Sequence, residues 1–86
     1  MLKRMEPVGR IDHYFTKLNV AVVELISPLR IGDQIALKRM TTDFEQSVNS
    51  IQIDREEIKE AKKGDSVGLK VKSRVREGDM IYRIIE

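Results

Sequence analysis

Six basic side chains have the residue types and spacing to meet the phosphate groups of a nucleic acid. Lys70 and Lys72 stand two residues apart in a strand-like run, so their side chains point to one face. The candidate set for nucleic-acid binding is Lys38, Arg39, Lys70, Lys72, Arg74 and Arg76. Contacts to phosphate carry little sequence preference. The same charges also fit a solvated strand face that blunts edge aggregation, or a surface for an acidic protein, so all three interpretations stay open.

Catalytic and metal-binding patterns are missing from the sequence. His13 is the only histidine, and no carboxylate or nucleophile stands at a spacing that would position it for acid–base chemistry. The serines have no histidine at motif spacing either. The acidic residues of 54–60 lack the Asp-x-Asp-x-Asp-Gly spacing of a calcium loop and are interleaved with basic residues. We therefore expect a protein that is not an enzyme and that holds no metal and no cofactor.

The bulk composition narrows the possibilities further. At 86 residues the chain is expected to form one domain, residues 1–86, with a thin core. Its 16 basic and 14 acidic residues leave a net charge of only +2, which by itself does not imply nucleic acid. There is no cysteine, no signal-peptide pattern and no apolar run approaching the ~20 residues that span a bilayer. The resulting expectation is a cytoplasmic protein without a membrane partner.

Short apolar runs with a period of two, separated by Gly, Pro and Asp, predict a succession of strands. The predicted strands are 8–15, 18–26, 34–40, 44–53, 66–72 and 80–85. In the fourth, the apolar parity changes between Val48 and Ile51, which predicts a β-bulge near Asn49-Ser50. Residues 55–62 are the only helix-like piece and should form at most one short helical turn.

The first predicted strand carries much of the aromatic signal. Alternation puts Ile11, His13 and Phe15 on the face toward the core, and Tyr14 on the opposite face with Arg10. Tyr14 is then the one exposed aromatic candidate, whereas proteins that bind single-stranded RNA usually show several aromatics among exposed basic residues. Base stacking is therefore poorly supported by the sequence.

Three Gly-Asp pairs each stand just before a predicted strand. They are Gly32-Asp33, Gly64-Asp65 and Gly78-Asp79. A tight turn at such a place needs a positive φ, which glycine adopts readily, and the aspartate can accept hydrogen bonds from backbone donors. Six strands joined by short turns, with no long helix, predict an all-β fold, namely a six-stranded closed antiparallel β-barrel without exposed edges.

The Gly-Asp pairs also belong to longer motifs that follow one another in a fixed order. These motifs are residues 29–37, 48–52, 61–69 and 75–81. Together they resemble the second, barrel-forming domain of the translation-factor GTPases, of the elongation factor Tu domain 2 type, over roughly residues 8–85. The resemblance implies a stand-alone elongation-factor-like protein whose barrel contacts ribosomal RNA, tRNA or a ribonucleoprotein. No Gly-x-x-x-x-Gly-Lys-Ser/Thr loop is present, so nucleotide hydrolysis is not expected.

The same motifs are similar to the C-terminal barrels of some collagenase-like peptidases, which gives a second hypothesis. In it the chain is an accessory barrel that holds a protein partner, or a second copy of itself, through an apolar surface patch. The residues for such a patch are Val22, Ile26, Met40 and Met80, because their strands are apolar on both faces. The sequence favours the RNA-binding module as the main interpretation and leaves the partner and the oligomeric state open.

Overall fold

The computed structural model describes residues 4–40 and 42–85, and within them ten strands form an all-β structure without a helix. Residues 1–3, 41 and 86, which the predicted domain 1–86 includes, lie outside the described residues. The strands are β1 (Arg4–Phe15), β2 (Val20–Leu25), β3 (Leu29–Arg30), β4 (Gln34–Arg39), β5 (Thr42–Ser47), β6 (Ile51–Ile53), β7 (Glu56–Ile58), β8 (Glu60–Ala61), β9 (Ser66–Lys70) and β10 (Met80–Ile85). The described residues include no helix long and apolar enough to cross a membrane. The all-β prediction is confirmed.

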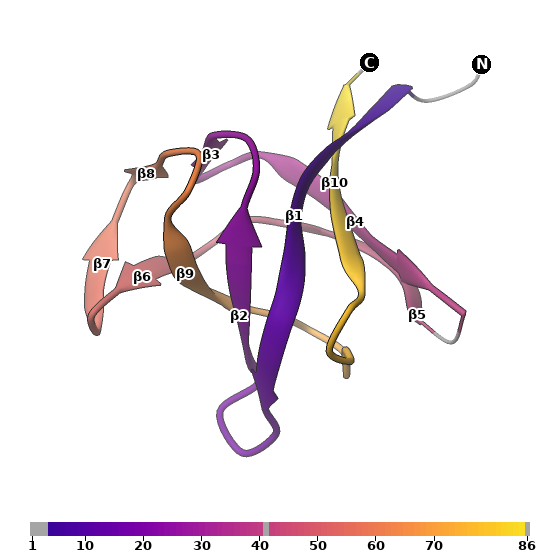
Figure 1. Cartoon of the computed structure of the whole chain (residues 1–86), viewed down its shortest axis with the longest axis horizontal. Coiled ribbons are helices and arrows are strands. Elements are labelled where there is room, and N and C mark those ends of the chain that lie inside the picture. Colours follow the sequence, from indigo (N-terminus) through magenta and orange to yellow (C-terminus); the bar gives the residue numbers. More distant parts are fainter. Residues whose placement is uncertain (1–3, 41, 86) are drawn as a thin grey trace.

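Eight of the strands form one antiparallel sheet that curves strongly (Figure 1). Its order is β5-β4-β10-β1-β2-β9-β6-β7, and β3 pairs separately with β8. The ladder runs from β5 at one edge to β7 at the other. The described strands therefore establish a mainly eight-stranded sheet, and not the predicted closed barrel of six strands.

The inner face of the curved sheet carries an aliphatic core. Ile35 and Leu37 of β4, like Val67 and Leu69 of β9, are buried as their period-two alternation predicts. The buried cluster contains Val8, Ile11, Ala21, Val23, Leu25, Leu29, Ile35, Leu37, Val48, Ile51, Ala61, Val67, Leu69, Val71, Val75 and Ile81. Because aliphatic side chains fill this interior, most charged groups are left to the outer face and the loops.

The predicted fourth strand, 44–53, is two strands in the structure. β5 pairs with β4, whereas β6 pairs with β9 and β7. Residues 48–50 between them are in no strand, and Val48 and Ile51 are both buried. The parity change therefore marks the point where the chain leaves one pairing partner for another, and the predicted bulge near Asn49-Ser50 is wrong.

Residues 55–62 do not form the expected helical turn. Instead β6 and β7 make a hairpin in which Ile53 pairs with Glu56, and β8 pairs with β3. The two residues of the hairpin loop, Asp54 and Arg55, have φ of 51° and 67°. Positive φ at both positions is typical of a type I′ turn, whose twist matches the flanking strands. Because neither residue is glycine or asparagine, the usual signal for this turn is missing from the sequence.

An irregularity in β1 reverses the predicted faces of its last residues. The register of β1 against β2 shifts between Ile11 and His13, so Asp12 is an extra residue at that point. A one-residue slip moves every later side chain to the other face of the sheet. His13 and Phe15 are consequently exposed and Tyr14 packs against the core, which is the opposite of the prediction.

Candidate functional site

Each Gly-Asp pair closes a four-residue turn, and the three turns have the same hydrogen bonds. The turns are residues 30–33, 62–65 and 76–79. Their glycines have φ of 94°, 93° and 88°. In each turn the aspartate N–H donates to the carbonyl of the first residue, at 3.1, 3.0 and 3.1 Å, and the aspartate Oδ2 accepts from the N–H of that residue at 2.9 Å. The aspartate therefore holds both ends of its own turn.

Each turn then docks on one buried residue of a neighbouring part of the chain. That residue is Val48 for the first turn, Leu25 for the second and Ile11 for the third. It accepts from the glycine N–H at 2.9, 2.9 and 2.8 Å, and it donates to the aspartate carbonyl at 2.8, 2.9 and 2.9 Å. Two residues opposing one, with a glycine at positive φ, is the arrangement of a G1 β-bulge. The Gly-Asp pairs thus set the starts of β4, β9 and β10.

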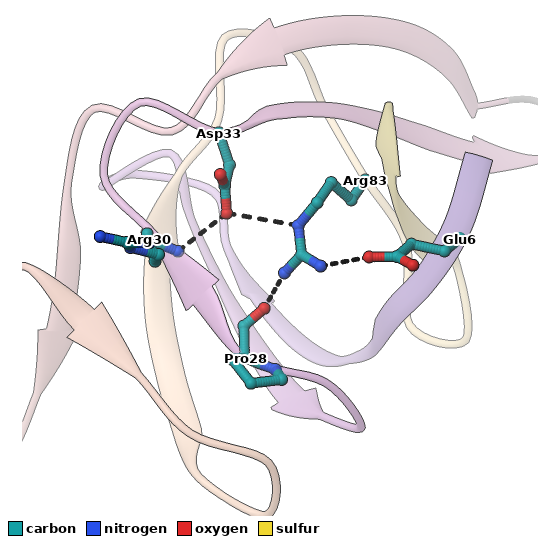
Figure 2. A network of polar contacts seen from close by, with 5 residues as sticks. All are labelled: Glu6, Pro28, Arg30, Asp33 and Arg83. Carbon is teal, nitrogen blue, oxygen red and sulfur yellow. Dashed lines mark hydrogen bonds and ion pairs between the residues drawn. The ribbon is translucent and has the colours of Figure 1, made fainter. Parts of the chain in front are cut away.

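The first turn is also tied to both terminal strands by Arg83 of β10, which sequence analysis missed (Figure 2). The Arg83 guanidinium pairs with Glu6 of β1 and donates to the carbonyl of Pro28. Its Nε also donates to Asp33 Oδ2 at 3.4 Å. The Arg83 side chain is only 20% exposed, so this network is partly shielded from water. One feature of the sequence points to Arg83, namely that it is the single charged residue in the otherwise largely apolar strand Met80–Ile85.

The six predicted basic residues do not gather on one surface. Lys38 pairs with Asp43, at 3.3 Å between Nζ and Oδ1, so its charge is neutralised locally. Arg74 is exposed and makes no ion pair with any described residue. The other four lie in two separate places, Lys70 with Lys72 and Arg39 with Arg76.

Lys70 and Lys72 border a shallow groove beside the edge strand β5. The side-chain amide of Gln46 bridges their backbones. Its Nε2 donates to the carbonyl of Lys70 and its Oε1 accepts from the N–H of Lys72, each at 2.8 Å. The Lys72 ammonium lies 6.0 Å from the centre of the Phe44 ring, at the outer limit of a cation–π contact. Gln46 therefore joins β5 to the chain that follows β9.

Arg39 and Arg76 line one depression, which lies between the β4–β5 connection and the segment that precedes β10. Arg39 lies at the end of β4, and its Nη1 donates at 3.4 Å to the carbonyl of Glu77, in the segment before β10. The end of β1, which leads into the β1–β2 connection, reaches the same residue, because Nδ1 of His13 lies 3.4 Å from Oε1 of Glu77. We name this region the three-loop surface. It consists of Arg39, Met40, Arg76 and Glu77 around one depression and of Phe15 and Leu18 around a second, which the contact between His13 and Glu77 connects to the first.

The residues predicted for an apolar patch also separate in the structure. Met40 is 96% exposed on the three-loop surface. Ile26, 47% exposed, lies beside Met80 in a different depression, and Val22 is only partly exposed. Phe15 was missed as an exposed side chain because the bulge in β1 was missed, and Leu18 because it was expected in the strand 18–26, whereas it lies in the turn before β2.

The chain is similar in sequence to curated proteins that are named as proteases. The chain is 41% identical over 80 residues to an uncharacterized protease of Methanocaldococcus jannaschii, and the match covers 92% of the chain but 20% of the protease. It is 37% identical over 78 residues to a collagenase of Porphyromonas gingivalis, with 88% of the chain and 22% of the collagenase covered. The chain thus spans about a fifth of the length of these curated relatives. No family model matches it.

The fold of the chain matches that of a domain whose structure has been solved. Two crystal structures of the C-terminal domain of a protein named as a putative U32 peptidase of Geobacillus thermoleovorans match with TM-scores of 0.84 and 0.85, at 24% and 22% identity. The two matches cover 88% and 91% of this chain, and 96% and 91% of the respective solved domains. The structure is therefore an all-β domain with the fold of a peptidase C-terminal domain. In sequence, its relatives are proteases and collagenases.

The expectation of a translation-factor-like, RNA-binding module is wrong. The related proteins are proteases rather than translation factors, and the second hypothesis from the sequence fits them better. The physical reason lies in the motifs that suggested the resemblance, since three of the four contain a Gly-Asp pair. Such a pair is favoured wherever a tight turn enters a ladder as a G1 bulge. The motifs therefore report a local backbone geometry, and that geometry does not identify a family or a nucleic-acid partner.

Proposed function

We propose that the chain is a non-catalytic, single-domain accessory module of the U32, collagenase-like protease family, and that it binds polypeptide substrate. The observation that carries the proposal is the limited extent of the sequence match. The match takes in 92% of the chain but only 20% of the Methanocaldococcus jannaschii protease. An alignment of this kind is expected when one domain is shared with a larger enzyme. The fold match to a peptidase domain that was solved separately supports the same interpretation.

The side chains of the domain favour binding over catalysis. His13 has a half-exposed side chain, and Glu77 is its hydrogen-bond partner among the described residues. Within residues 4–40 and 42–85, no three His, Cys, Asp or Glu side chains are grouped to hold a metal ion. In this proposal the peptide-bond chemistry belongs to the remainder of the protease. The domain adds affinity, because a second binding module raises the effective concentration of a tethered substrate.

The proposal includes closure of the curved sheet into a barrel. Gln46 supports closure, since its amide connects the edge strand β5 to the backbone of Lys70, at the end of β9, and of Lys72, which follows it. A closed barrel has no free sheet edges, so it presents its loops at the ends as the natural places for a ligand.

Collagen-derived polypeptide is the first substrate to test, because two of the relatives are named collagenases. The experiment measures binding of the 86-residue chain to immobilised gelatin, with an albumin-coated surface as control, and in parallel the release of peptides from soluble gelatin. Reversible binding without peptide release is the expected result. Cleavage by the chain alone, or absence of binding to both gelatin and unfolded casein, would contradict the proposal.

A further inference from the structure

We propose that the three-loop surface binds an acidic segment of the polypeptide substrate, one that also carries large apolar side chains. This inference rests on the proposed function and names the substrate class for one surface of the domain. Three features carry it. They are exposed apolar groups on a fixed support, a local excess of positive charge, and a position away from the start of β1.

The three-loop surface exposes three large apolar side chains. Phe15 is 45% exposed, Leu18 62% and Met40 96%. The bulge at Asp12 is what turns Phe15 outward, since regular alternation would place it toward the core. Bulges often lie next to functional sites, where they re-aim a side chain. Exposed aromatic and aliphatic groups beside arginine are typical of surfaces that bind protein.

The β1–β2 connection is held in place, so its apolar groups are ordered before a ligand arrives. The rings of His13 and Phe15 make an edge-to-face contact with their centroids 4.4 Å apart. The Tyr14 hydroxyl donates to Asn19 Oδ1 at 3.1 Å, and the carbonyl of Asn19 accepts from the N–H of Val71 at 2.9 Å. A preorganised surface loses less conformational entropy when it binds.

Positive charge exceeds negative charge by one over the two depressions, where Lys17, Arg39 and Arg76 stand against Glu77 and Asp79. Arg39 and Arg76 flank Glu77, whose carboxylate already contacts His13. The neighbouring carboxylate of Asp79 is 1% exposed and accepts from the backbone N–H of Arg76. The guanidinium of Arg76 makes no ion pair with any described residue. It is therefore open to a carboxylate from a ligand, and arginine binds carboxylates through two parallel hydrogen bonds.

The position of the surface indicates which polypeptide occupies it. β1 starts and β10 ends together at one end of the sheet, and the β1–β2 connection lies at the opposite end (Figure 1). In a peptidase that carries this domain at its C-terminus, the rest of the enzyme precedes β1. The three-loop surface then faces away from that junction. This favours a separate chain, the substrate, over the catalytic part as the occupant.

An anionic membrane is the other ligand that exposed apolar groups beside arginines could meet. Glu77 argues against it, because its side chain is 70% exposed within the surface and would face anionic headgroups with a like charge. A peptide can instead offer a backbone N–H or a basic side chain to that carboxylate. The observations therefore favour a peptide, and vesicles enter the test as a competing outcome.

The test measures binding of three short fluorescein-labelled peptides to the 86-residue chain by fluorescence anisotropy. The first peptide contains Glu, Leu and Phe, the second has Lys in place of each Glu, and the third has Ser in place of each Leu and Phe. We expect the first to bind at least about tenfold more tightly than either of the others, and its affinity to fall as salt is raised.

Two double variants locate the site. Arg39→Glu with Arg76→Glu, and separately Phe15→Ser with Leu18→Ser, should each weaken the first peptide at least about tenfold. Two matched controls change similar exposed groups elsewhere. Lys59→Glu with Lys62→Glu reverses two charges, and Ile31→Ser removes an apolar side chain. The control variants should bind like the unmodified chain. Circular dichroism verifies that every variant is folded.

The outcomes separate this inference from the proposed function. Binding to gelatin with no preference for the acidic apolar peptide, or with both double variants unaffected, overturns the inference and leaves the proposed function standing. Failure to bind gelatin, casein and all three peptides overturns both. Binding to vesicles of anionic phospholipid without binding to the peptides assigns the surface to lipid and overturns the inference.

Discussion

A Cβ atom added to Gly9 would lie 2.6 Å from the backbone carbonyl oxygen of Glu24. Gly9 is buried in β1, opposite Leu25 of β2, and the register of β1 against β10 shifts between Pro7 and Gly9. The two backbones therefore approach each other as closely as only glycine allows. The nearest obstacle is main chain and the next is the short, branched side chain of Val23 at 2.7 Å, so no long flexible side chain can relieve the contact by moving aside.

Replacing Gly9 with alanine should lower the free energy of unfolding by about 2–3 kcal/mol, because the Glu24 backbone has to shift. Urea denaturation followed by circular dichroism measures the change. The matched control is Gly68→Ala, whose Cβ would lie 3.3 Å from the Val20 side chain and no nearer than 3.9 Å to Gln52. The control should lose less than about 1 kcal/mol. Equal losses in the two variants would show that the approach of Gly9 to Glu24 is not limiting.

Substitution of Gly64 tests the cost of backbone strain at a position where an added side chain would make no steric contact. A Cβ at Gly64 would meet nothing within 4 Å, while its φ is +93°. Gly64→Ala should therefore lose about 1–2 kcal/mol of stability, which is the strain of alanine in the left-handed region. Gly64→Asn should lose less, since asparagine tolerates that region. An alanine variant as stable as the unmodified chain would mean that the turn of residues 62–65 does not need a positive φ.

Several strands could be predicted from local chemistry alone. β4, β9 and β10 each begin directly after a Gly-Asp pair, and in β4 and β9 aliphatic residues alternate toward the core. The bulge at Asp12 could not be predicted, because one residue inserted into a strand leaves no glycine or proline as a signal. The turn at Asp54 and Arg55 was hidden for a similar reason, since both adopt positive φ without being glycine.

The three-loop surface depends on these hidden features, which is why the sequence only partly indicated it. Phe15 faces outward solely because of the bulge. Arg39 and Arg76 were both expected among the exposed basic residues, but they come together only when β4 pairs with β10. Lys70 and Lys72, which were predicted to share a surface with them, lie elsewhere. Local patterns carry little information about which loops meet across a sheet.

Substitution of Asp79 tests how much the hydrogen bond from the aspartate side chain to its own turn contributes to stability. It is 1% exposed, and its Oδ2 accepts from the N–H of Arg76 at 2.9 Å. Asp79→Ala leaves that donor without its partner and should lose about 1–2 kcal/mol. Asp79→Asn keeps an acceptor oxygen and should recover most of the loss. Asp65→Ala removes the same bond from a less buried copy of the turn, where water can replace it, and should lose less by urea denaturation. The reverse order would contradict this account.

Arg83 should not be replaceable by lysine. One guanidinium serves Glu6, Asp33 and the carbonyl of Pro28, and a single ammonium lacks the planar fork needed for this (Figure 2). Arg83→Lys should lose about 1–2 kcal/mol in thermal or urea unfolding, since partly buried acceptors are left unpaired. The control is Arg30→Lys, because Arg30 contributes its backbone N–H to Asp33 and its side chain is not required. If the Arg83→Lys variant is as stable as the Arg30→Lys control, the planar guanidinium of Arg83 has no structural role.

Gln46 tests the proposed closure of the barrel. Its amide makes one 2.8 Å bond to the carbonyl of Lys70 and another to the N–H of Lys72. A side-chain amide offers the same donor and acceptor as a peptide group, so it can act as one rung between β5 and the chain after β9. Gln46→Ala removes both bonds. Hydrogen exchange of the Lys72 amide should then be at least about tenfold faster, through local opening rather than global unfolding.

Two controls show whether the opening is confined to that seam. Gln46→Glu keeps the acceptor for Lys72 and should preserve much of the protection of its amide, while losing the donor to Lys70. The amide of Leu25 donates to the carbonyl of Asp65, directly before the start of β9. Its exchange rate should be unchanged in both variants. If the Lys72 amide exchanges at the same rate in the alanine variant, Gln46 does not join the edge strand β5 to the chain at the end of β9, and the proposal of a closed barrel loses its support.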